Sequence, residues 1–238
     1  MELGQIAIVG GGRLGTALAT ALRAAPPLGR DAPVPPGAAI VLLCVPDGVI
    51  AQAAAALGDP VGGRLVGHCS GATGLDALAP HEALGLHPLM TIAPGAAPDV
   101  FAGAGCAVAG TSPRALATAH KLALRLGMRA TEVADADRAA YHAAAAMASN
   151  FLTTIEGAAE RLAATAGVGR ELLVPLVRAS VENWAALGAE RAMTGPIARG
   201  DAATIERHRA AIAERAPELG DLYDVLAEAT RRVARTAA

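Results

Sequence analysis

The stretch Gln5-Ile6-Ala7-Ile8-Val9-Gly10-Gly11-Gly12-Arg13-Leu14-Gly15 decides the fold of this 238-residue chain. Its first five residues form a short apolar run rich in Ile and Val, which is typical of a buried strand. Glycines in the pattern G-x-G-x-x-G follow at once, and the alanine-rich segment 13–25 is predicted to be a helix. A strand that runs through this pattern into a helix is typical of the first unit of a dinucleotide-binding fold.

The position of these glycines carries more weight than the pattern itself. Glycine fills 27 of the 238 positions, so three glycines at fixed spacing arise by chance about 0.3 times in such a chain. In a dinucleotide-binding loop Gly10 would allow the tight turn, Gly12 the approach of a pyrophosphate, and Gly15 the close packing of helix and strand. The helix N-terminus offers free N–H groups to phosphate oxygens. We therefore predict that the cofactor is bound by Gly10, Gly12, Arg13, Leu14 and Gly15. The alternative is a glycine turn without a cofactor.

The rest of the chain predicts an α/β domain followed by an all-helical one. A continuous apolar run at 39–45 predicts another strand, and shorter strands are predicted at 65–68, 84–87, 106–109 and 128–133, with helical segments between them. This alternation predicts a Rossmann-type, mostly parallel sheet with helices on both faces over residues 1–134. Residues 135–238 carry no strand pattern, only long helical stretches with apolar residues at spacings of three and four. Asp47 and Asp201 are predicted to cap the helices that follow them.

The second strand of the nucleotide-binding fold is almost missing, because a Pro-rich link fills residues 25–39. That strand normally ends in an acidic residue that binds the adenosine ribose. Asp31 would suit the ribose of NAD, whereas Arg30 or Arg13 would bind the 2′-phosphate of NADP. Both kinds of residue are present, and we favour NADP with NAD as the alternative.

Composition argues against several classes of partner and cofactor chemistry. The formal net charge of −2 and the scarcity of aromatic residues argue against nucleic-acid binding. No apolar run approaches the roughly 18 residues of a membrane span, and no secretory signal is recognisable, so we expect a cytoplasmic protein. Cys44, Cys69 and Cys106 are predicted to be buried, reduced thiols. Lys121 is the only lysine, which leaves a single candidate for lysine chemistry.

Several further motifs resemble one family. They are Val45-Pro46-Asp47, His68-Cys69-Ser70-Gly71, His87-Pro88-Leu89, Tyr141-His142 through Ser149-Asn150, and Thr194-Gly195-Pro196 through Arg199-Gly200-Asp201. With the glycine motif they resemble, over nearly the whole chain, the bacterial Rossmann-like proteins that carry domain of unknown function 2520. That family is similar in architecture to pyrroline-5-carboxylate reductase and to the 6-phosphogluconate dehydrogenase-like superfamily.

The resemblance implies an NAD(P)-dependent reductase that acts on a small molecule and forms a homodimer through its helical domain. One feature of the superfamily is not matched here. The lysine that its β-hydroxyacid dehydrogenases use has no counterpart, because Lys121 falls on a predicted helix of the nucleotide-binding domain.

The candidate site residues follow from the position of the motifs. Ligands of open α/β sheets bind beyond the carboxyl ends of the strands. Val45 and Pro46 are therefore predicted to lie along the cofactor. Ser70 is predicted to bind a substrate carbonyl or carboxylate, with a purely structural turn as the alternative. Arg199 is a candidate carboxylate clamp, and Asn150 a candidate catalytic amide on the first long helix.

Histidines are the candidate acid–base groups, because imidazole titrates near neutral pH. His87 or His142 is predicted to supply a proton, and His68 to line the substrate cleft. For His68 and His87, at the ends of strands, the alternative is a structural hydrogen bond to a neighbouring backbone group. No metal site is predicted, because His68, Cys69, His81 and His87 match no common zinc spacing.

The leading hypothesis is hydride transfer from NAD(P)H to a small carbonyl or imine substrate. The alternative is a module that binds a dinucleotide or metabolite without turnover, which the short second strand and the missing lysine favour. A flavin- or deazaflavin-linked reductase is a third possibility.

Overall fold

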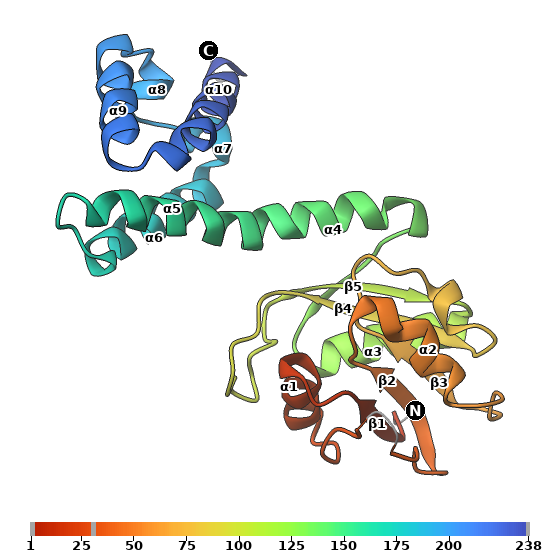
Figure 1. The fold of residues 1–238 in the computed structure, drawn as a ribbon. Helices are drawn as coiled ribbons and strands as arrows, with labels where there is room; N and C mark the ends of the chain where they lie inside the picture. Colours follow the sequence, from red (N-terminus) through yellow and green to blue (C-terminus); the bar gives the residue numbers. More distant parts are fainter. Residues whose placement is uncertain (1–2, 30–31, 237–238) are drawn as a thin grey trace. The chain divides into compact units, whose positions relative to one another are not determined.

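The computed structural model describes residues 3–29 and 32–236, and the chain forms two compact units, Met1–Ser149 and Asn150–Ala238. The first unit is a sheet surrounded by helices and the second contains helices alone (Figure 1). The predicted fold class is therefore confirmed. The strand series ends at Glu132, and the first unit continues beyond it to Ser149. The domain boundary after residue 134 stays a prediction.

The sheet of the first unit has six strands that follow one another in chain order. They are β1 Gln5–Val9, β2 Ala38–Leu43, β3 Leu65–His68, β4 Ala83–Leu89, β5 Gly105–Gly110 and β6 Arg129–Glu132. All neighbouring pairs are parallel except β4 and β5, which are antiparallel. Leu43 is paired with His68, so β2 and β3 end side by side. The loops after these two strands are thereby brought together.

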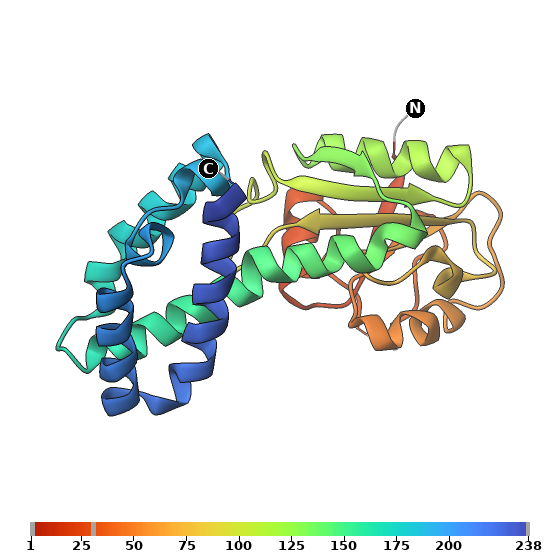
Figure 2. The ribbon, with the colours of Figure 1, turned by 90° about the horizontal axis from the view of Figure 1, so that it is seen from above.

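Helices cover both faces of this sheet, as Figure 2 shows for α2 and α3. One face packs against α1 (Arg13–Leu22) and α3 (Pro113–Arg125). The other packs against η2 (Leu75–Leu78) and α2 (Ile50–Ala55), which follows the turn η1 (Asp47–Val49). The side chains of successive residues in a strand point alternately to the two faces of the sheet. In β2, Ile40 and Leu42 belong to the first core cluster, and Val41 and Leu43 to the second. Burial on both sides explains why β2 is continuously apolar, whereas the edge strand β6 is exposed.

A single residue occupies the position of the missing second strand. Leu28 forms an isolated parallel bridge with Val9 at the edge of β1. Its backbone N–H donates to the Ile8 carbonyl at 2.7 Å, and its carbonyl accepts from the Gly10 N–H at 2.9 Å. The edge of β1 beside the glycine loop is thus hydrogen-bonded by a one-residue strand. Arg30 and Asp31, which were predicted to bind the adenosine end of the cofactor, lie outside the described residues.

Of the two residues predicted to cap helices, one does so and the other does not. Asp201 accepts a hydrogen bond from the Thr204 N–H at 3.0 Å and caps α9, as predicted. The prediction for Asp47 is wrong, because its side chain makes no capping hydrogen bond. Asp47 begins the 3₁₀ turn η1 after Pro46, and α2 starts only at Ile50. Pro46 holds an extended conformation there, so the chain turns before it becomes helical.

A chain of helices follows the sheet. The first unit ends with η3 (Asp135–Asp137), α4 (Arg138–Ala146) and the start of a π-helical turn, η4 (Met147–Phe151). The other elements are α5 Leu152–Ala164, α6 Arg170–Leu187, α7 Ala189–Ala192, α8 Pro196–Arg199, α9 Ala202–Arg215, η5 Pro217–Leu219 and α10 Gly220–Thr236. The short helix α8 lies within the motif that runs from Thr194 to Asp201.

The second unit has a small core of its own. Its buried cluster contains Ala158, Ile212, Ala216 and Leu219, with Tyr223 packed against it. Helix α6 contributes no buried residue over its full length. Within the described ranges, every helix is either too short or too polar to cross a membrane.

Candidate functional site

The glycine loop has two glycines that packing requires and two that face open space. Gly10 has φ +107°, and a Cβ added there would lie 2.3 Å from the Cys44 carbonyl oxygen. A Cβ on Gly15 would lie 1.9 Å from the Gly10 carbonyl oxygen. A Cβ on Gly11 or Gly12 would meet no atom within 4 Å. The loop therefore packs tightly against β2 and leaves its middle open for a ligand.

The N-terminus of α1 follows this open space without a cap from the protein. Gly12 is the N-cap residue, no side chain makes a capping hydrogen bond, and the first turn contains no acidic residue. The first N–H groups of a helix have no partner within the helix and favour an anion. Arg13 adds a positive charge at the same place. The donor set suits a phosphate group, so the loop fits the pyrophosphate of a dinucleotide.

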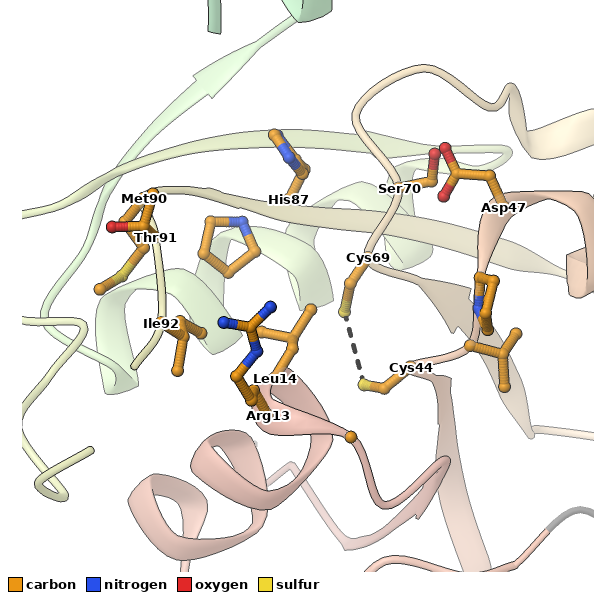
Figure 3. A pocket seen from close by; sticks show the side chains of 14 residues that line it. Arg13, Leu14, Cys44, Asp47, Cys69, Ser70, His87, Met90, Thr91 and Ile92 are labelled. Atoms are coloured by element: carbon orange, nitrogen blue, oxygen red, sulfur yellow. Dashed lines mark hydrogen bonds between the residues drawn. The ribbon is translucent and has the colours of Figure 1, made fainter. Parts of the chain in front are cut away.

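A cleft of about 520 Å³ lies next to the loop, within the range usual for ligand pockets. Its walls come from the start of α1 and from the chain beyond the carboxyl ends of β2, β3 and β4 (Figure 3). The lining residues are Gly12, Arg13, Leu14, Cys44, Val45, Pro46, Asp47, Cys69, Ser70, His87, Pro88, Met90, Thr91 and Ile92. Seven of the predicted site residues are thus brought together: Gly12, Arg13, Leu14, Val45, Pro46, Ser70 and His87.

His87, on β4, makes the most informative polar contact in the cleft. Its Nδ1 lies 2.7 Å from the hydroxyl of Tyr141 on α4, and the two rings meet edge to face. Burial, with the neighbouring His142 as the next cause, lowers the pKa of His87 to about 4. The imidazole is therefore neutral at physiological pH. Burial raises the pKa of Tyr141, so its phenol keeps its proton.

Gly71 holds the imidazoles of His87 and His142 close together. A Cβ at Gly71 would lie 2.8 Å from Cε1 and 3.0 Å from Nε2 of His87, and 2.9 Å from Cδ2 of His142. The two rings lie 6.2 Å apart between centroids. The close packing explains why the turn after Ser70 needs a glycine. Nε2 of His87 faces this turn, while Nδ1 is held by Tyr141.

Ser70 and His68 build that turn. The Ser70 Oγ accepts from the backbone N–H groups of Ala72 and Thr73 and contacts the Thr73 hydroxyl at 3.0 Å. The Ser70 N–H donates to His68 Nδ1 at 3.2 Å, and His68 Nε2 donates to the Gly74 carbonyl at 3.2 Å. With Nδ1 as acceptor, the neutral tautomer satisfies both contacts.

His68 does not line the cleft, contrary to the prediction. The side chain is fully buried and both ring nitrogens are engaged within the protein. Burial lowers its pKa, with the charge of Arg138 acting in the same direction. His68 therefore acts as a neutral support for the Ser70 turn. Ser70 lines the cleft, but its hydroxyl serves the turn, which was the alternative considered for it.

A buried cation lies behind the histidines. Arg138, at the start of α4, is 4% exposed and donates through Nε to Asp135 at 2.7 Å. Its positive charge helps to lower the pKa values of His68 and His87. The Arg138–Asp135 pair also secures the first turn of α4, from which Tyr141 and His142 project. The sequence analysis did not single out Arg138.

The remaining predicted residues lie elsewhere. Gly10 and Gly15 support the cleft floor and are not part of its lining. Asn150 and Arg199 belong to the second unit, and their predicted roles stay predictions. Asn150 lies in the π-helical turn η4, a kind of irregularity that is frequent at functional sites. Arg199 ends the short helix α8 and is exposed.

Two kinds of site residue escaped the sequence analysis. Tyr141 was given no role of its own, although its hydroxyl contacts His87. Its position beside His142 in the same motif was the available signal. Cys44 and Cys69 were predicted only as buried thiols, but both line the cleft, and Cys44 is only half-buried. All three cysteines are free. Within the described residues, no group of three or more His, Cys, Asp or Glu side chains is arranged to bind a metal.

Comparison with known proteins supports this picture of the fold. The family model described as domain of unknown function (DUF2520) matches residues 104–230. Protein BF3122 from Bacteroides fragilis, proposed to be an NADP oxidoreductase, is 21% identical, with a TM-score of 0.82 over 96% of this chain and 98% of that chain. Protein TM1727 from Thermotoga maritima is 24% identical, with a TM-score of 0.82 over 97% and 99%.

More distant structures include a known reductase class. A reductive aminase from Aspergillus terreus in complex with NADPH and ethyl-5-oxohexanoate is 18% identical, with a TM-score of 0.65 over 96% of this chain and 94% of that chain. These likenesses show a shared fold. No curated protein matches the sequence.

Proposed function

This chain belongs to the family of the domain of unknown function DUF2520, and from that premise we propose that it is an NAD(P)-dependent oxidoreductase. One observation carries the proposal. An open glycine loop leads into an uncapped helix N-terminus beside a cleft of about 520 Å³. The structures of similar fold include proteins described with NADP or NADPH, which supports the same class of cofactor.

In this proposal the backbone N–H groups at Gly12, Arg13 and Leu14 hold the cofactor's pyrophosphate, and the Arg13 guanidinium serves the 2′-phosphate of NADP. Val45 and Pro46 line the cleft alongside it. We favour NADP over NAD, because Arg13 is the cation of the cleft lining. Arg30 retains its proposed role at the 2′-phosphate. When bound, the nicotinamide supplies a hydride to a small carbonyl or imine substrate.

His87 is the proposed partner of the substrate's polar atom. Its low pKa means that it acts as a neutral imidazole. If Tyr141 donates its O–H to Nδ1, the His87 proton resides on Nε2, and that N–H can donate to a carbonyl oxygen or imine nitrogen. Tyr141 then fixes the tautomer and orientation of the ring. A neutral imidazole of this kind polarises a double bond rather than carrying a full positive charge.

His142 and the Ser70 turn complete the arrangement. His142 packs beside His87 over Gly71 and lowers the pKa of His87. It is exposed at the surface of the first unit. Ser70 and His68 position Gly71 beneath both rings. We propose Ser70 as a positioning residue in place of the substrate ligand first predicted.

The test is a reductase assay with NADPH and NADH against a panel of small ketones, aldehydes and cyclic imines. Wild-type protein is expected to transfer the nicotinamide hydride to at least one substrate. Tyr141→Phe removes the hydroxyl and keeps the ring, so kcat should fall by about 10- to 100-fold while the Kd for the cofactor stays unchanged. The absence of both cofactor binding and oxidation in the wild type would overturn the proposal.

A second candidate function is a dinucleotide-binding module without turnover. The one-residue strand at Leu28 favours it, because a reduced second strand offers less surface for adenosine recognition. Tight cofactor binding without hydride transfer to any substrate of the panel would support this alternative. A flavin-linked reductase is distinguished by visible absorbance of the purified protein.

We also propose that the protein is a cytoplasmic homodimer assembled through its helical unit. The support is the apolar surface of α6, none of whose residues is buried in the single chain. Leu172, Leu176 and Trp184 are each at least 59% exposed. Isolated apolar residues are common on surfaces, but several on one helix indicate a contact with another protein surface.

A further inference from the structure

We propose that Cys44 and Cys69 form a redox-active dithiol in the wall of the cleft, which a hydroperoxide converts to a disulfide. The oxidation itself is independent of the proposed function. Its consequence, a loss of dinucleotide affinity, rests on that function.

The two cysteines occupy equivalent positions on neighbouring strands. Leu43 of β2 is paired with His68 of β3, and Cys44 and Cys69 are the next residue of each chain segment. Their Sγ atoms lie 3.8 Å apart, as the dashed line in Figure 3 marks. Neighbouring strands lie about 4.8 Å apart, inside the roughly 4.4–6.8 Å range of Cα separations that disulfides accept. The register therefore places the two cysteines within reach of a disulfide, and the remaining approach of the sulfurs requires a small movement.

Both sulfur atoms belong to residues that a small oxidant can reach. Cys44 and Cys69 line the cleft, and Cys44 is the more exposed of the two. Cys106 is the internal comparison. It is 1% exposed, its Sγ contacts the Ala107 carbonyl oxygen at 3.7 Å, and burial raises its pKa to about 12. Cys106 should stay reduced when the other two react.

The two thiols have different roles in the reaction. The pKa of Cys69 is raised well above that of a free cysteine by the hydrogen bond between Cys69 and Cys44 and by burial. Cys69 therefore keeps its proton. Cys44 is the more exposed of the two residues, so it meets the peroxide first and is the attacking sulfur, and Cys69 is the resolving one.

The reaction balances with hydrogen peroxide as the oxidant. The Cys44 sulfur attacks one peroxide oxygen, the O–O bond breaks, and a sulfenic acid and water form. The Cys69 sulfur then attacks the Cys44 sulfur, the S–OH bond breaks, and a second water leaves with the Cys69 proton. Two thiols lose two electrons and two protons in total, and the peroxide is reduced to two waters. A thiol reductant reverses the change.

Disulfide formation would act on the glycine loop, because Cys44 packs against it. The carbonyl group of Cys44 lies against Gly10, and the Cβ of Cys44 lies 3.2 Å from where a Cβ on Gly15 would be. The backbone N–H of Cys44 donates to the Val9 carbonyl at 2.7 Å. The sulfurs must approach from 3.8 Å to about 2.05 Å. The movement draws Cys44 toward β3 and shifts the support of the loop. We expect the Kd for the dinucleotide to rise by about tenfold, because displacements near 1 Å in a site are costly.

The experiment treats the reduced full-length protein with a small excess of hydrogen peroxide. Thiols are then counted in denaturant and the intact mass is measured. Wild type should lose two of its three thiols and two hydrogen atoms in mass, and dithiothreitol should restore both. Peptide mapping should find Cys44 joined to Cys69. Cys106→Ser is the matched control, and it should still form the disulfide.

Two single variants test the order of attack. In Cys69→Ser the sulfenic acid at Cys44 has no resolving thiol, so the protein should gain one oxygen atom and react with dimedone. In Cys44→Ser neither a disulfide nor a dimedone adduct should form. Three surviving thiols in oxidised wild type, or a disulfide that includes Cys106 or a second chain, would overturn the proposal.

Calorimetric titration of the reduced and oxidised protein with NADPH separates the two parts of the inference. Weaker binding after oxidation supports the effect on the loop. Unchanged binding in a protein with the mapped disulfide overturns that effect. If neither form binds any nicotinamide dinucleotide, the proposed function fails, and thiol counting still decides whether the dithiol exists.

Discussion

The two units of this chain bury their apolar residues very differently. The first unit packs a sheet between two dense clusters, each with residues that are completely inaccessible to solvent. The second unit has a cluster of four buried residues, and none of the residues of α6 is buried. A domain must remove its apolar surface from water to be stable alone. The difference teaches that the first unit is complete in itself, whereas the second has a surface suited to a partner.

The largest expected effect breaks the complete unit. Gly15→Ala would place a methyl group 1.9 Å from the Gly10 carbonyl oxygen, where only backbone movement relieves the clash. We expect the first unit to lose more than about 3 kcal/mol of unfolding free energy, measured by urea denaturation. Gly12→Ala is the matched control, since its methyl group meets open space. Equal stability of the two variants would contradict the described loop packing.

The next effect concerns a histidine that the first unit keeps neutral. The pKa of His87 is about 4 in the folded protein and about 6.5 when unfolded. Between these values the unfolded chain binds the proton and the folded one does not, so stability is retained above pH 6.5 and lost as pH falls toward 4. The loss from His87 should be on the order of 2 kcal/mol. His68, whose pKa is also lowered, adds in the same direction.

NMR titration of the histidine ring protons measures the pKa directly. His87→Gln should remove the signal that titrates near pH 4 and reduce the acid sensitivity of the urea midpoint. Titration of His87 near 6.5 would show that the ring is solvated and that its environment differs from the one described.

The third effect sharpens the description of the second unit. Trp184 is 59% exposed on α6 and is expected to lie in the dimer contact. Trp184→Ala should weaken the dimer by about 1–2 kcal/mol, measured by sedimentation equilibrium. Glu182→Ala, two residues away on the same helix, should leave the dimer unchanged. A monomeric wild type would show that the exposed surface serves another purpose.

The smallest effect tests a local feature of the second unit. Asp201 caps α9 through the Thr204 N–H. Asp201→Ala should lower the unfolding free energy by about 1 kcal/mol, and Asp201→Ser should recover most of it. Thermal unfolding followed by circular dichroism measures both. A larger loss would indicate that Asp201 also has a role in the packing of the second unit.

Much of the fold was predictable from the sequence, because its signals are local. Strands β1, β2 and β5 are short apolar runs, and burial on both faces keeps the run continuous in β2. The edge strand β6 is exposed and has no such signal. The glycine loop was predictable from local signals, since Gly10, Gly12 and Gly15 meet requirements set within a few residues. The prediction that Asp47 caps the helix was wrong because Asp47 lies inside a 3₁₀ turn that follows the extended Pro46 and precedes the helix.

The site was harder to predict because its contacts join distant segments. His87 and Tyr141 are separated by 54 residues, and their hydrogen bond depends on where α4 starts relative to β4. The pairing of Cys44 with Cys69 follows from the register of β2 and β3, which the sequence does not state. His68 and His87 look equivalent as histidines on or after strands. Only the structure separates the one that is fully buried from the one that lines the cleft.

The central claim is that the open glycine loop of the first unit binds a nicotinamide dinucleotide. Calorimetric titration with NADPH and NADH, with inorganic phosphate as a control, tests it most directly. The account predicts micromolar binding of at least one cofactor by the wild type, and binding at least about tenfold weaker in Gly12→Ala, which should fold normally. No binding by the wild type, or equal binding by Gly12→Ala, would contradict it.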